Sequence, residues 1–244
     1  MTRLQGKVAL VTGGSRGIGR AIAERLGRDG ADVALTYAGN RDKAEAVADT
    51  IRAGGVRALA LASDLRDVSQ TRALFAAVLE QFGRLDIVVN NAGISVFKPT
   101  TDIDEADYDR VMDTNARGTF FALQEAARHV ADGGRIINLA SGATRQALPA
   151  AGVYAASKAA VEQFGMALAK ELGPRGITVN QIGPGVTDTD GLIMPAEALA
   201  HLIASTPLGR LGQPADLADV VAFLASDDAR WVNGQTLQVN GGIL

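Results

Sequence analysis

The stretch KVALVTGGSRGIG, residues 7–19, decides the fold of this chain of 244 residues. Its first six residues, KVALVT, form a short apolar run that glycines close, and this pattern predicts a buried strand. Apolar residues with helical spacing follow over residues 17–29, so the glycines stand between a strand and a helix. Glycines at such a turn bring backbone N–H groups close to a pyrophosphate at the helix N-terminus. The stretch therefore predicts a dinucleotide-binding turn.

The same alternation of strand and helix continues along the chain. Further strands are predicted at residues 31–37, 56–63, 85–90, 135–140, 177–182 and 236–240. Further helices are predicted at residues 41–53, 68–82, 105–130, 152–172 and 214–226. Alternating strands and helices imply crossover connections and a parallel sheet that is covered on both faces. We therefore expect one α/β domain over residues 1–244, a doubly wound Rossmann fold with a seven-stranded parallel sheet.

Residues 187–212, between the sixth strand and the last helix, depart from this alternation of strands and helices. The segment holds the apolar run Leu192, Ile193 and Met194, followed by Pro195 and Pro207. An insertion after the carboxyl end of a strand lies where such sheets bind ligands. The segment is therefore interpreted as a substrate lid.

The composition excludes several classes of function. The net charge is -3, so the basic surface that nucleic acids or anionic membranes require is absent. The chain has no cysteine, which excludes disulfides and thiolate chemistry, and its two histidines lack metal-ligand spacing, so no metal is expected. The N-terminal apolar run is too short for a signal peptide or a membrane span, and a cytoplasmic protein is expected.

The end of the second predicted strand indicates which dinucleotide is bound. An Asp or Glu usually holds a 2′-hydroxyl there, and its charge would repel a 2′-phosphate. This chain has no acid over residues 36–41, the stretch TYAGNR. Arg16 lies in the glycine turn, where its cation could meet the phosphate. Both features favour NADP(H).

Tyr154 and Lys158, in the stretch YAASK, stand four residues apart on a predicted helix and so share one face. Hydride transfer to a ketone builds negative charge on oxygen, which needs a proton donor. Free tyrosine has a pKa of about 10, and a lysine cation nearby would lower it. Alone, Tyr154 could equally be a half-buried packing residue.

Several motifs in order resemble the short-chain dehydrogenase/reductase family, and most closely its 3-oxoacyl-(acyl-carrier-protein) reductase-type members. The resemblance runs from Lys7 to Gly242. The motifs are TGGSRGIG at 12–19, Asp64-Leu65, NNAG at 90–93, Asn115, Ser141, Tyr154-x-x-x-Lys158 and Pro184-Gly185.

The resemblance implies four catalytic residues. Tyr154 matches the catalytic acid/base, and Lys158 matches its cationic partner, which also binds the nicotinamide ribose. Ser141 matches the donor to the substrate carbonyl. Asn115 matches the helix residue that holds a water for the proton relay.

The same resemblance implies a set of cofactor-binding residues for NADP(H). The set is Gly13, Ser15, Arg16, Gly17, Ile18, Gly19, Tyr37, Asn40, Asp64, Leu65, Asn90, Ala92, Gly93, Tyr154, Lys158, Pro184, Gly185, Thr187 and Thr189. Within it, Asp64 and Leu65 match positions that flank the adenine. Thr187 and Thr189 match positions that contact the nicotinamide amide and the phosphates.

The function expected is that of an NADPH-dependent ketoreductase acting on a 3-oxoacyl thioester or a related small-molecule carbonyl, which could be bound to an acyl carrier. A sugar or polyol dehydrogenase that runs the oxidation remains open. So does a protein of another class, a non-catalytic NADP(H)-binding sensor on the same fold. Family members are commonly homotetramers, and helices 105–130 and 152–172 match their usual dimer surface.

An apolar pocket wall is expected beside the catalytic residues. Its members are Val96, Phe97, Leu148, Leu192, Ile193 and Met194, which suit an apolar chain or ring. Arg117 and Arg145 could attract an anionic carrier, although surface arginines are usually solvated.

Overall fold

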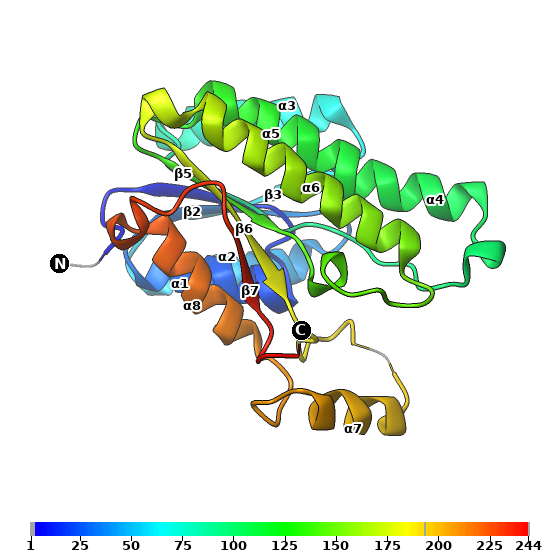
Figure 1. Ribbon diagram of the computed structural model, residues 1–244. Helices are drawn as coiled ribbons and strands as arrows, with labels where there is room; N and C mark the ends of the chain where they lie inside the picture. Colours follow the sequence, from blue (N-terminus) through cyan, green and yellow to red (C-terminus); the bar gives the residue numbers. More distant parts are fainter. Residues whose placement is uncertain (1–2, 193, 244) are drawn as a thin grey trace.

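Seven parallel strands form the centre of the computed structural model, which describes residues 3–192 and 194–243 (Figure 1). The strands are β1 (Val8–Val11), β2 (Asp32–Tyr37), β3 (Ala58–Ala62), β4 (Ile87–Asn90), β5 (Arg135–Leu139), β6 (Thr178–Pro184) and β7 (Thr236–Val239). Their order is β3-β2-β1-β4-β5-β6-β7, and every neighbouring pair is parallel. The expected seven-stranded parallel sheet is confirmed.

Helices cover both faces of this sheet (Figure 1). One face carries α1 (Gly17–Arg28), α2 (Arg41–Ala53) and α8 (Pro214–Ala225). The other face carries α3 (Val68–Phe82), α5 (Thr119–His129) and α6 (Gly152–Glu171). The expected doubly wound arrangement is therefore confirmed.

Successive residues of each strand supply the two hydrophobic cores. In β1, Ala9 and Val11 pack in the core beneath α1, α2 and α8, whereas Val8 and Leu10 pack in the core beneath α3, α5 and α6. All four side chains are almost completely inaccessible to solvent. Because both faces are buried, the strands have continuous apolar sequences instead of alternating polar and apolar residues.

The helix expected over residues 105–130 is present without a break over residues 105–129, but its geometry changes midway. It consists of α4 (Glu105–Val111), a π-helical segment (Met112–Gly118) and α5. Such a segment widens the helical turn and often marks a functional site. Gly118, the last residue of this segment, packs closely against Leu65, which follows β3. A Cβ at Gly118 would lie 2.8 Å from the carbonyl oxygen of Leu65. The segment carries Asn115, whose side chain is fully buried.

The interruption expected at residues 187–212 contains one helix, α7 (Ala196–Ser205). No residue of α7 is buried, and Figure 1 shows it beyond the carboxyl ends of β6 and β7, away from the layered body. The two ends of the segment are joined by a parallel bridge between Thr187 and Gly212. Ile193 lies outside the described residues.

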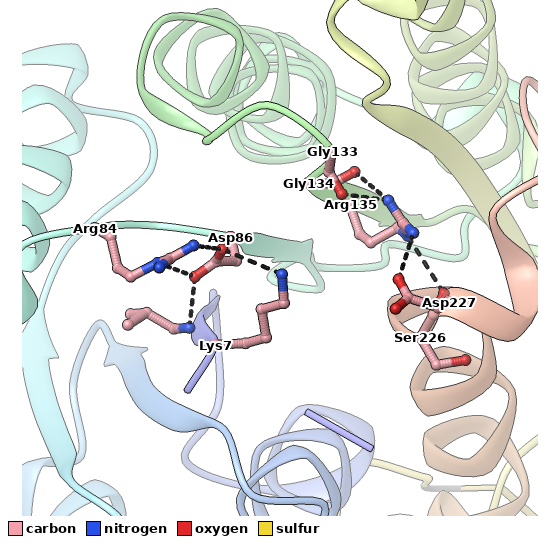
Figure 2. A network of polar contacts seen from close by, with 9 residues as sticks. Lys7, Arg84, Asp86, Gly133, Gly134, Arg135, Ser226 and Asp227 are labelled. Atoms are coloured by element: carbon pink, nitrogen blue, oxygen red, sulfur yellow. Dashed lines mark hydrogen bonds and ion pairs between the residues drawn. The ribbon is translucent and has the colours of Figure 1, made fainter. Parts of the chain in front are cut away.

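A polar network fixes the opposite edge of the sheet, where the strands begin (Figure 2). The Asp86 carboxylate is buried beside β4 and accepts hydrogen bonds from the Val8 backbone N–H (2.9 Å) and from Arg84 (2.8 Å). Arg135, at the start of β5, is buried and pairs with Asp227 at 3.2 Å. It also donates to the carbonyl oxygens of Gly133, Gly134 and Ser226. These contacts pair buried charges that would otherwise destabilise the fold.

Residues 3–192 and 194–243 include no helix with both the length and the apolar character that crossing a membrane requires. Across the same part of the chain, no group of three or more His, Asp or Glu side chains gathers into a possible metal site.

Candidate active site

The glycine turn after β1 is packed so tightly that two of its positions have no room for a side chain. A Cβ at Gly19 would lie 2.2 Å from the Gly13 carbonyl oxygen. Gly13 has a positive φ of 65°, and a Cβ there would lie 3.0 Å from the Cα of Ala92. The Gly13 N–H donates to the Thr36 hydroxyl at 3.0 Å, which ties the turn to the end of β2. The predicted turn between strand and helix is therefore present.

A cavity of about 550 Å³ opens over this turn, at the carboxyl ends of β1, β2 and β4. Thirteen of the predicted cofactor-binding residues line it: Gly13, Ser15, Arg16, Gly17, Ile18, Gly19, Tyr37, Asn40, Asp64, Leu65, Ala92, Gly93 and Thr189. Arg16, the residue before α1, makes no side-chain cap, so the first N–H groups of α1 are available to an anion. The cavity lies beside β1, where the order of strands reverses.

One cation that the sequence reasoning missed also lines this cavity. Lys43, in the first turn of α2, forms an ion pair at 3.6 Å with Asp190, which follows Thr189 in the cavity wall. The Asn40 side chain accepts a hydrogen bond from the Lys43 N–H and so caps α2. Asn40 is a typical N-cap residue, and a lysine follows it in the first turn of the helix. This pattern could have indicated that Lys43 lies beside the cavity.

Asp64 lies at the far end of the cavity, where its carboxylate pairs with Arg66 at 2.6 Å. The hydrogen bond from the Arg66 side chain lowers the pKa of Asp64 below its usual value. Leu65 is buried beside it. Asp64 is therefore held as a carboxylate facing the end of the cavity distant from Tyr154.

Of the two adjacent asparagines in the NNAG motif, the structure turns Asn91, and not Asn90, toward the glycine turn. The Asn90 side chain is buried in the sheet and donates a hydrogen bond of 2.9 Å to Asn138. Asn90 is not among the residues that line the cavity. The Asn91 side chain donates to the carbonyl oxygens of Thr12 (2.9 Å) and Gly13 (3.1 Å). Asn91 therefore fixes the shape of the turn.

A second cavity, of about 470 Å³, adjoins the first and contains three of the four predicted catalytic side chains. Ser141, Tyr154 and Lys158 line it, together with Pro184, Gly185 and Thr187 from the end of β6. The two cavities share a set of lining residues, Ile18, Asn91, Gly93, Ile94, Thr189 and Gly191. A molecule that filled the first cavity would therefore end next to Tyr154.

Lys158 is a buried cation with a neutral partner. Its ammonium group donates a hydrogen bond of 2.8 Å to the carbonyl oxygen of Leu139, the last residue of β5. Burial lowers the pKa of Lys158 to about 8. Near neutral pH the side chain still carries a proton for most of the time.

Tyr154 lies one turn earlier on the same face of α6. Burial raises the pKa of the Tyr154 hydroxyl above its usual value, and the hydrogen bond with Ser141 partly opposes that shift. Its ring meets the Phe97 ring edge-on, with 5.5 Å between ring centroids. The expected lowering of the Tyr154 pKa by Lys158 is not found, because desolvation by burial is the largest influence on the pKa of the Tyr154 hydroxyl.

Asn115 lies behind the catalytic side chains and lines neither cavity. Its amide nitrogen donates to the Ile94 carbonyl oxygen (2.8 Å) and to the Ser157 hydroxyl (3.0 Å), and its amide oxygen accepts from the Ile94 N–H (2.8 Å). The side chain is therefore occupied in joining α6 to the chain after β4. A water contact at this position would have to use other atoms.

Ser141 follows β5 directly and opens a 3₁₀ turn, Gly142–Thr144. Its hydroxyl accepts a hydrogen bond of 3.2 Å from the Ala143 N–H, so its proton remains available to a substrate carbonyl. The turn and the residues after it form one wall of the second cavity.

Most of the expected apolar wall is present. Phe97, Leu148, Leu192 and Met194 line the second cavity, and Leu202 of α7 joins them. Val96 is not among the lining residues, and Ile193 lies outside the described part of the chain.

The two arginines considered as attractants for an anionic carrier are both engaged within the protein. Arg145 pairs with Glu162 at 3.2 Å. Arg117 donates to the Arg66 carbonyl oxygen at 2.9 Å and lies over the Phe121 ring. Neither arginine lines the two cavities.

Similar proteins of known family share this architecture over the full chain. Residues 13–244 match the family model described as Enoyl-(Acyl carrier protein) reductase. An uncharacterized oxidoreductase of Methylorubrum extorquens is 46% identical, with 100% of both chains covered. A short chain dehydrogenase from Burkholderia cenocepacia, solved in complex with NADP, is 45% identical, with a TM-score of 0.95 and 99% of both chains covered.

A third protein carries a more specific description. The angucycline C-6 ketoreductase, solved with bound NADP, is 44% identical with a TM-score of 0.95, and the match covers 99% of this chain and 97% of that one. A family model that covers nearly the whole chain, together with identities above 40% over full-length relatives, identifies the family. The chain belongs to the short-chain dehydrogenase/reductase family of oxidoreductases.

Proposed function

We propose that the protein is an NADPH-dependent ketoreductase. The observation that carries the proposal is the junction of the two cavities: the one over the glycine turn ends at Tyr154, Lys158 and Ser141. A bound dinucleotide would then present its reactive end to a carbonyl held at those three side chains. The substrate class proposed is a 3-oxoacyl thioester or a related apolar ketone.

The first cavity fits a dinucleotide phosphate. The glycines allow the tight turn that lines the cavity, and the uncapped N-terminus of α1 offers N–H donors and a partial positive charge. Arg16 adds a full positive charge beside the 2′-end of the site, where β2 ends without an acid. The solved relatives with NADP bound support the same choice of cofactor.

In the reaction proposed, the cofactor supplies a hydride to the carbonyl carbon when it is bound. The Ser141 hydroxyl donates a hydrogen bond to the carbonyl oxygen and fixes its position. The Tyr154 hydroxyl donates its proton to that oxygen as negative charge develops. Lys158 carries a positive charge one turn away, which stabilises the tyrosinate that remains.

The raised pKa of Tyr154 favours the reductive direction over the alternative polyol oxidation. Reduction needs the protonated hydroxyl, which burial favours, whereas oxidation needs the tyrosinate, which burial disfavours. The wall formed by Phe97, Leu148 and Met194 also suits an apolar ketone better than a sugar. A non-catalytic sensor would not need Ser141, Tyr154 and Lys158 to face one cavity.

Three further assignments accompany the proposal. Residues 187–212 act as the substrate lid, supported by the position of Leu192, Met194 and Leu202 in the cavity wall. A homotetramer and a cytoplasmic location remain predictions from the family resemblance and the sequence. An acyl carrier as partner also stays a prediction.

The experiment that tests the proposal is NADPH oxidation by the purified protein with a panel of carbonyl substrates. The panel contains 3-oxoacyl thioesters, cyclic ketones, quinones and sugars. We expect turnover with at least one apolar ketone and none with sugars. Binding of NADPH without turnover on any member of the panel would instead support the sensor.

A further inference from the structure

A buried carboxylate, Glu162, lies on the same face of α6 as the proposed catalytic pair. Tyr154, Lys158 and Glu162 stand at successive intervals of four residues, so their side chains follow one stripe along the helix. Glu162 is 5% exposed, and glutamates are rarely buried this deeply unless they have partners. The proposed reaction assigns it no role.

The partners of Glu162 come from the turn that follows Ser141. The Thr144 hydroxyl donates a hydrogen bond of 2.6 Å to one carboxylate oxygen of Glu162, and the Arg145 guanidinium donates one of 3.2 Å to the other. The Thr144 hydroxyl also lies 2.9 Å from the carbonyl oxygen of Ser141. The Thr144 hydroxyl therefore lies between Glu162 on α6 and the carbonyl oxygen of Ser141, and its single proton can go to either acceptor.

We propose that Glu162 is a positioning residue for ketone reduction, which holds the turn Gly142–Thr144 against α6 and so sets the place of the Ser141 hydroxyl relative to the Tyr154 hydroxyl. The inference rests on the proposed function, because it assigns Glu162 a task in the same reaction. It names a residue that touches neither cavity.

The geometry explains why such an anchor is needed. Ser141 and Tyr154 belong to different elements, the end of β5 and the start of α6, and both must meet one carbonyl oxygen. The Ser141 hydroxyl accepts a hydrogen bond from the Ala143 N–H of its own turn, and it also lowers the pKa of the Tyr154 hydroxyl by a hydrogen bond, so the position of the turn sets the distance between the two hydroxyls. A small displacement of a positioned donor lowers the rate strongly, because the reacting atoms must meet within a narrow range of distances.

The hydrogen bond with Thr144 is the main link, and the ion pair with Arg145 is secondary. The Arg145 side chain is 51% exposed, so solvent screens its charge, whereas the contact with Thr144 is short and partly buried. A glutamine at position 162 could keep a hydrogen bond with the Thr144 hydroxyl, since its amide group both donates and accepts. Hydrogen bonding at this position, and not negative charge, is therefore the property that matters.

The test compares Glu162→Ala with Glu162→Gln in the full-length protein, with NADPH and the best ketone from the panel. We expect Glu162→Ala to lower kcat by about tenfold or more and Glu162→Gln by less than about threefold. NADPH affinity, measured by fluorescence titration, should stay within about twofold in both variants, because Glu162 does not line the cavity over the glycine turn. Gln163→Ala, an exposed neighbour on α6, is the matched control and should leave kcat unchanged.

A double-mutant cycle with Ser141→Ala decides whether Glu162 acts through Ser141. In the Ser141→Ala background, Glu162→Ala should cost less than about twofold further, since the group that it positions is already gone. Additive losses would overturn the proposal, and so would an equal loss in Glu162→Gln and Glu162→Ala. If Glu162→Ala does not fold, Thr144→Val enters the same cycle, because it removes the hydroxyl and keeps the pair of Glu162 with Arg145.

The cycle also separates this proposal from the proposed function. Full activity in Ser141→Ala alone would overturn the role of Ser141 in the reaction, and with it the target that Glu162 positions. Suppose instead that Ser141→Ala loses activity and that the losses in the double variant are additive. The proposed ketoreductase function would then stand, and only the positioning role of Glu162 would be overturned.

Discussion

The ammonium group of Lys158 donates a hydrogen bond of 2.8 Å to the carbonyl oxygen of Leu139, a neutral group at the end of β5. No carboxylate among the described residues forms an ion pair with Lys158. The fold therefore buries a cation without an anionic partner, which costs free energy of folding. Such a cost at a proposed catalytic residue is the usual sign of stability given up for activity.

Replacing this cation should stabilise the protein. The pKa of Lys158 is lowered in the folded state to about 8. Below that pH Lys158 is protonated in both the folded and the unfolded state. The lowered pKa then corresponds to a loss of about 3 kcal/mol in the free energy of unfolding. We expect Lys158→Met to raise the free energy of unfolding at pH 7 by about 2 kcal/mol, since losing the bond to Leu139 costs about 1 kcal/mol. Urea denaturation measures this change.

The sign of the pH dependence provides a control for that experiment. Between about pH 8 and pH 10.5 the unfolded state binds more protons than the folded state, so wild-type stability rises with pH over this range. The advantage of Lys158→Met should therefore shrink across the range and disappear near its upper end. A variant less stable than wild type at pH 7 would contradict the expected burial cost.

The same titration should appear in the kinetics of reduction. Above about pH 8 Lys158 loses its charge, whereas Tyr154, whose pKa is raised, keeps its proton. We expect kcat/KM for NADPH to fall above this pH, because that ratio reports groups of the free enzyme. Lys158→Arg, which stays charged, should show no such fall in whatever activity it retains. A flat wild-type profile up to about pH 10 would argue against the role of the lysine charge.

Removing the Tyr154 hydroxyl should abolish most of the activity without disturbing the fold. Tyr154→Phe keeps the ring and its edge-on contact with Phe97. We expect kcat to fall by at least about 10²-fold, the usual contribution of a positioned proton donor. Circular dichroism should give the wild-type spectrum. Turnover near the wild-type rate would exclude Tyr154 as the proton donor.

The parts of the site that local sequence patterns could predict are those set within one element or one turn. The spacing of Tyr154 and Lys158 on a helix places both on one face, and the glycines between β1 and α1 leave few other conformations. The sequence does not predict that Asn91 fixes the glycine turn, because which of two adjacent side chains leaves the sheet depends on where β4 ends. A shift of one residue along a strand moves a side chain to the opposite face of the sheet.

Other features depend on contacts between distant segments and have no local signal. The sequence around Glu162 predicts an ordinary exposed glutamate on a helix. Its hydrogen bonds with Thr144 and Arg145 appear only in the folded structure. The π-helical segment around Asn115 lies inside a helix that the sequence predicts, and the close packing of Gly118 at its end on Leu65 is a tertiary contact without a local signal. The raised pKa of Tyr154 likewise follows from burial that no spacing of residues reveals.

A side chain at Gly93 should crowd the proposed catalytic residues. A Cβ at Gly93 would lie 3.1 Å from both the Lys158 ammonium nitrogen and the Asn115 amide oxygen. We expect Gly93→Ala to displace Lys158 and lower kcat by about tenfold or more. Gly39→Ala is the matched control: Gly39 lines the same cavity, and its Cβ would meet nothing within 4 Å. Equal activity in the two variants would show that the position of Lys158 is not critical.

Arg16 should determine the preference for NADPH over NADH. Two cations line the cavity over the glycine turn, but Lys43 is already paired with Asp190, whereas Arg16 forms no ion pair within residues 3–192 and 194–243. A free guanidinium can bind a 2′-phosphate with charge-assisted hydrogen bonds. We expect wild-type protein to bind NADPH at least about tenfold more tightly than NADH, and Arg16→Ala to lose most of that difference.

The matched variant is Lys43→Ala, which removes a cation from the same cavity. Its effect on NADPH affinity should be smaller than that of Arg16→Ala, because the pair with Asp190 already neutralises the charge and solvent screens it. NADH affinity should change by less than about twofold in both variants, since the effect requires the 2′-phosphate. Fluorescence titration of wild type and both variants with NADPH and with NADH, at low and high salt, measures these affinities, and the loss in Arg16→Ala should diminish at high salt. Equal affinities of the wild-type protein for NADPH and NADH would remove the basis for the cofactor assignment.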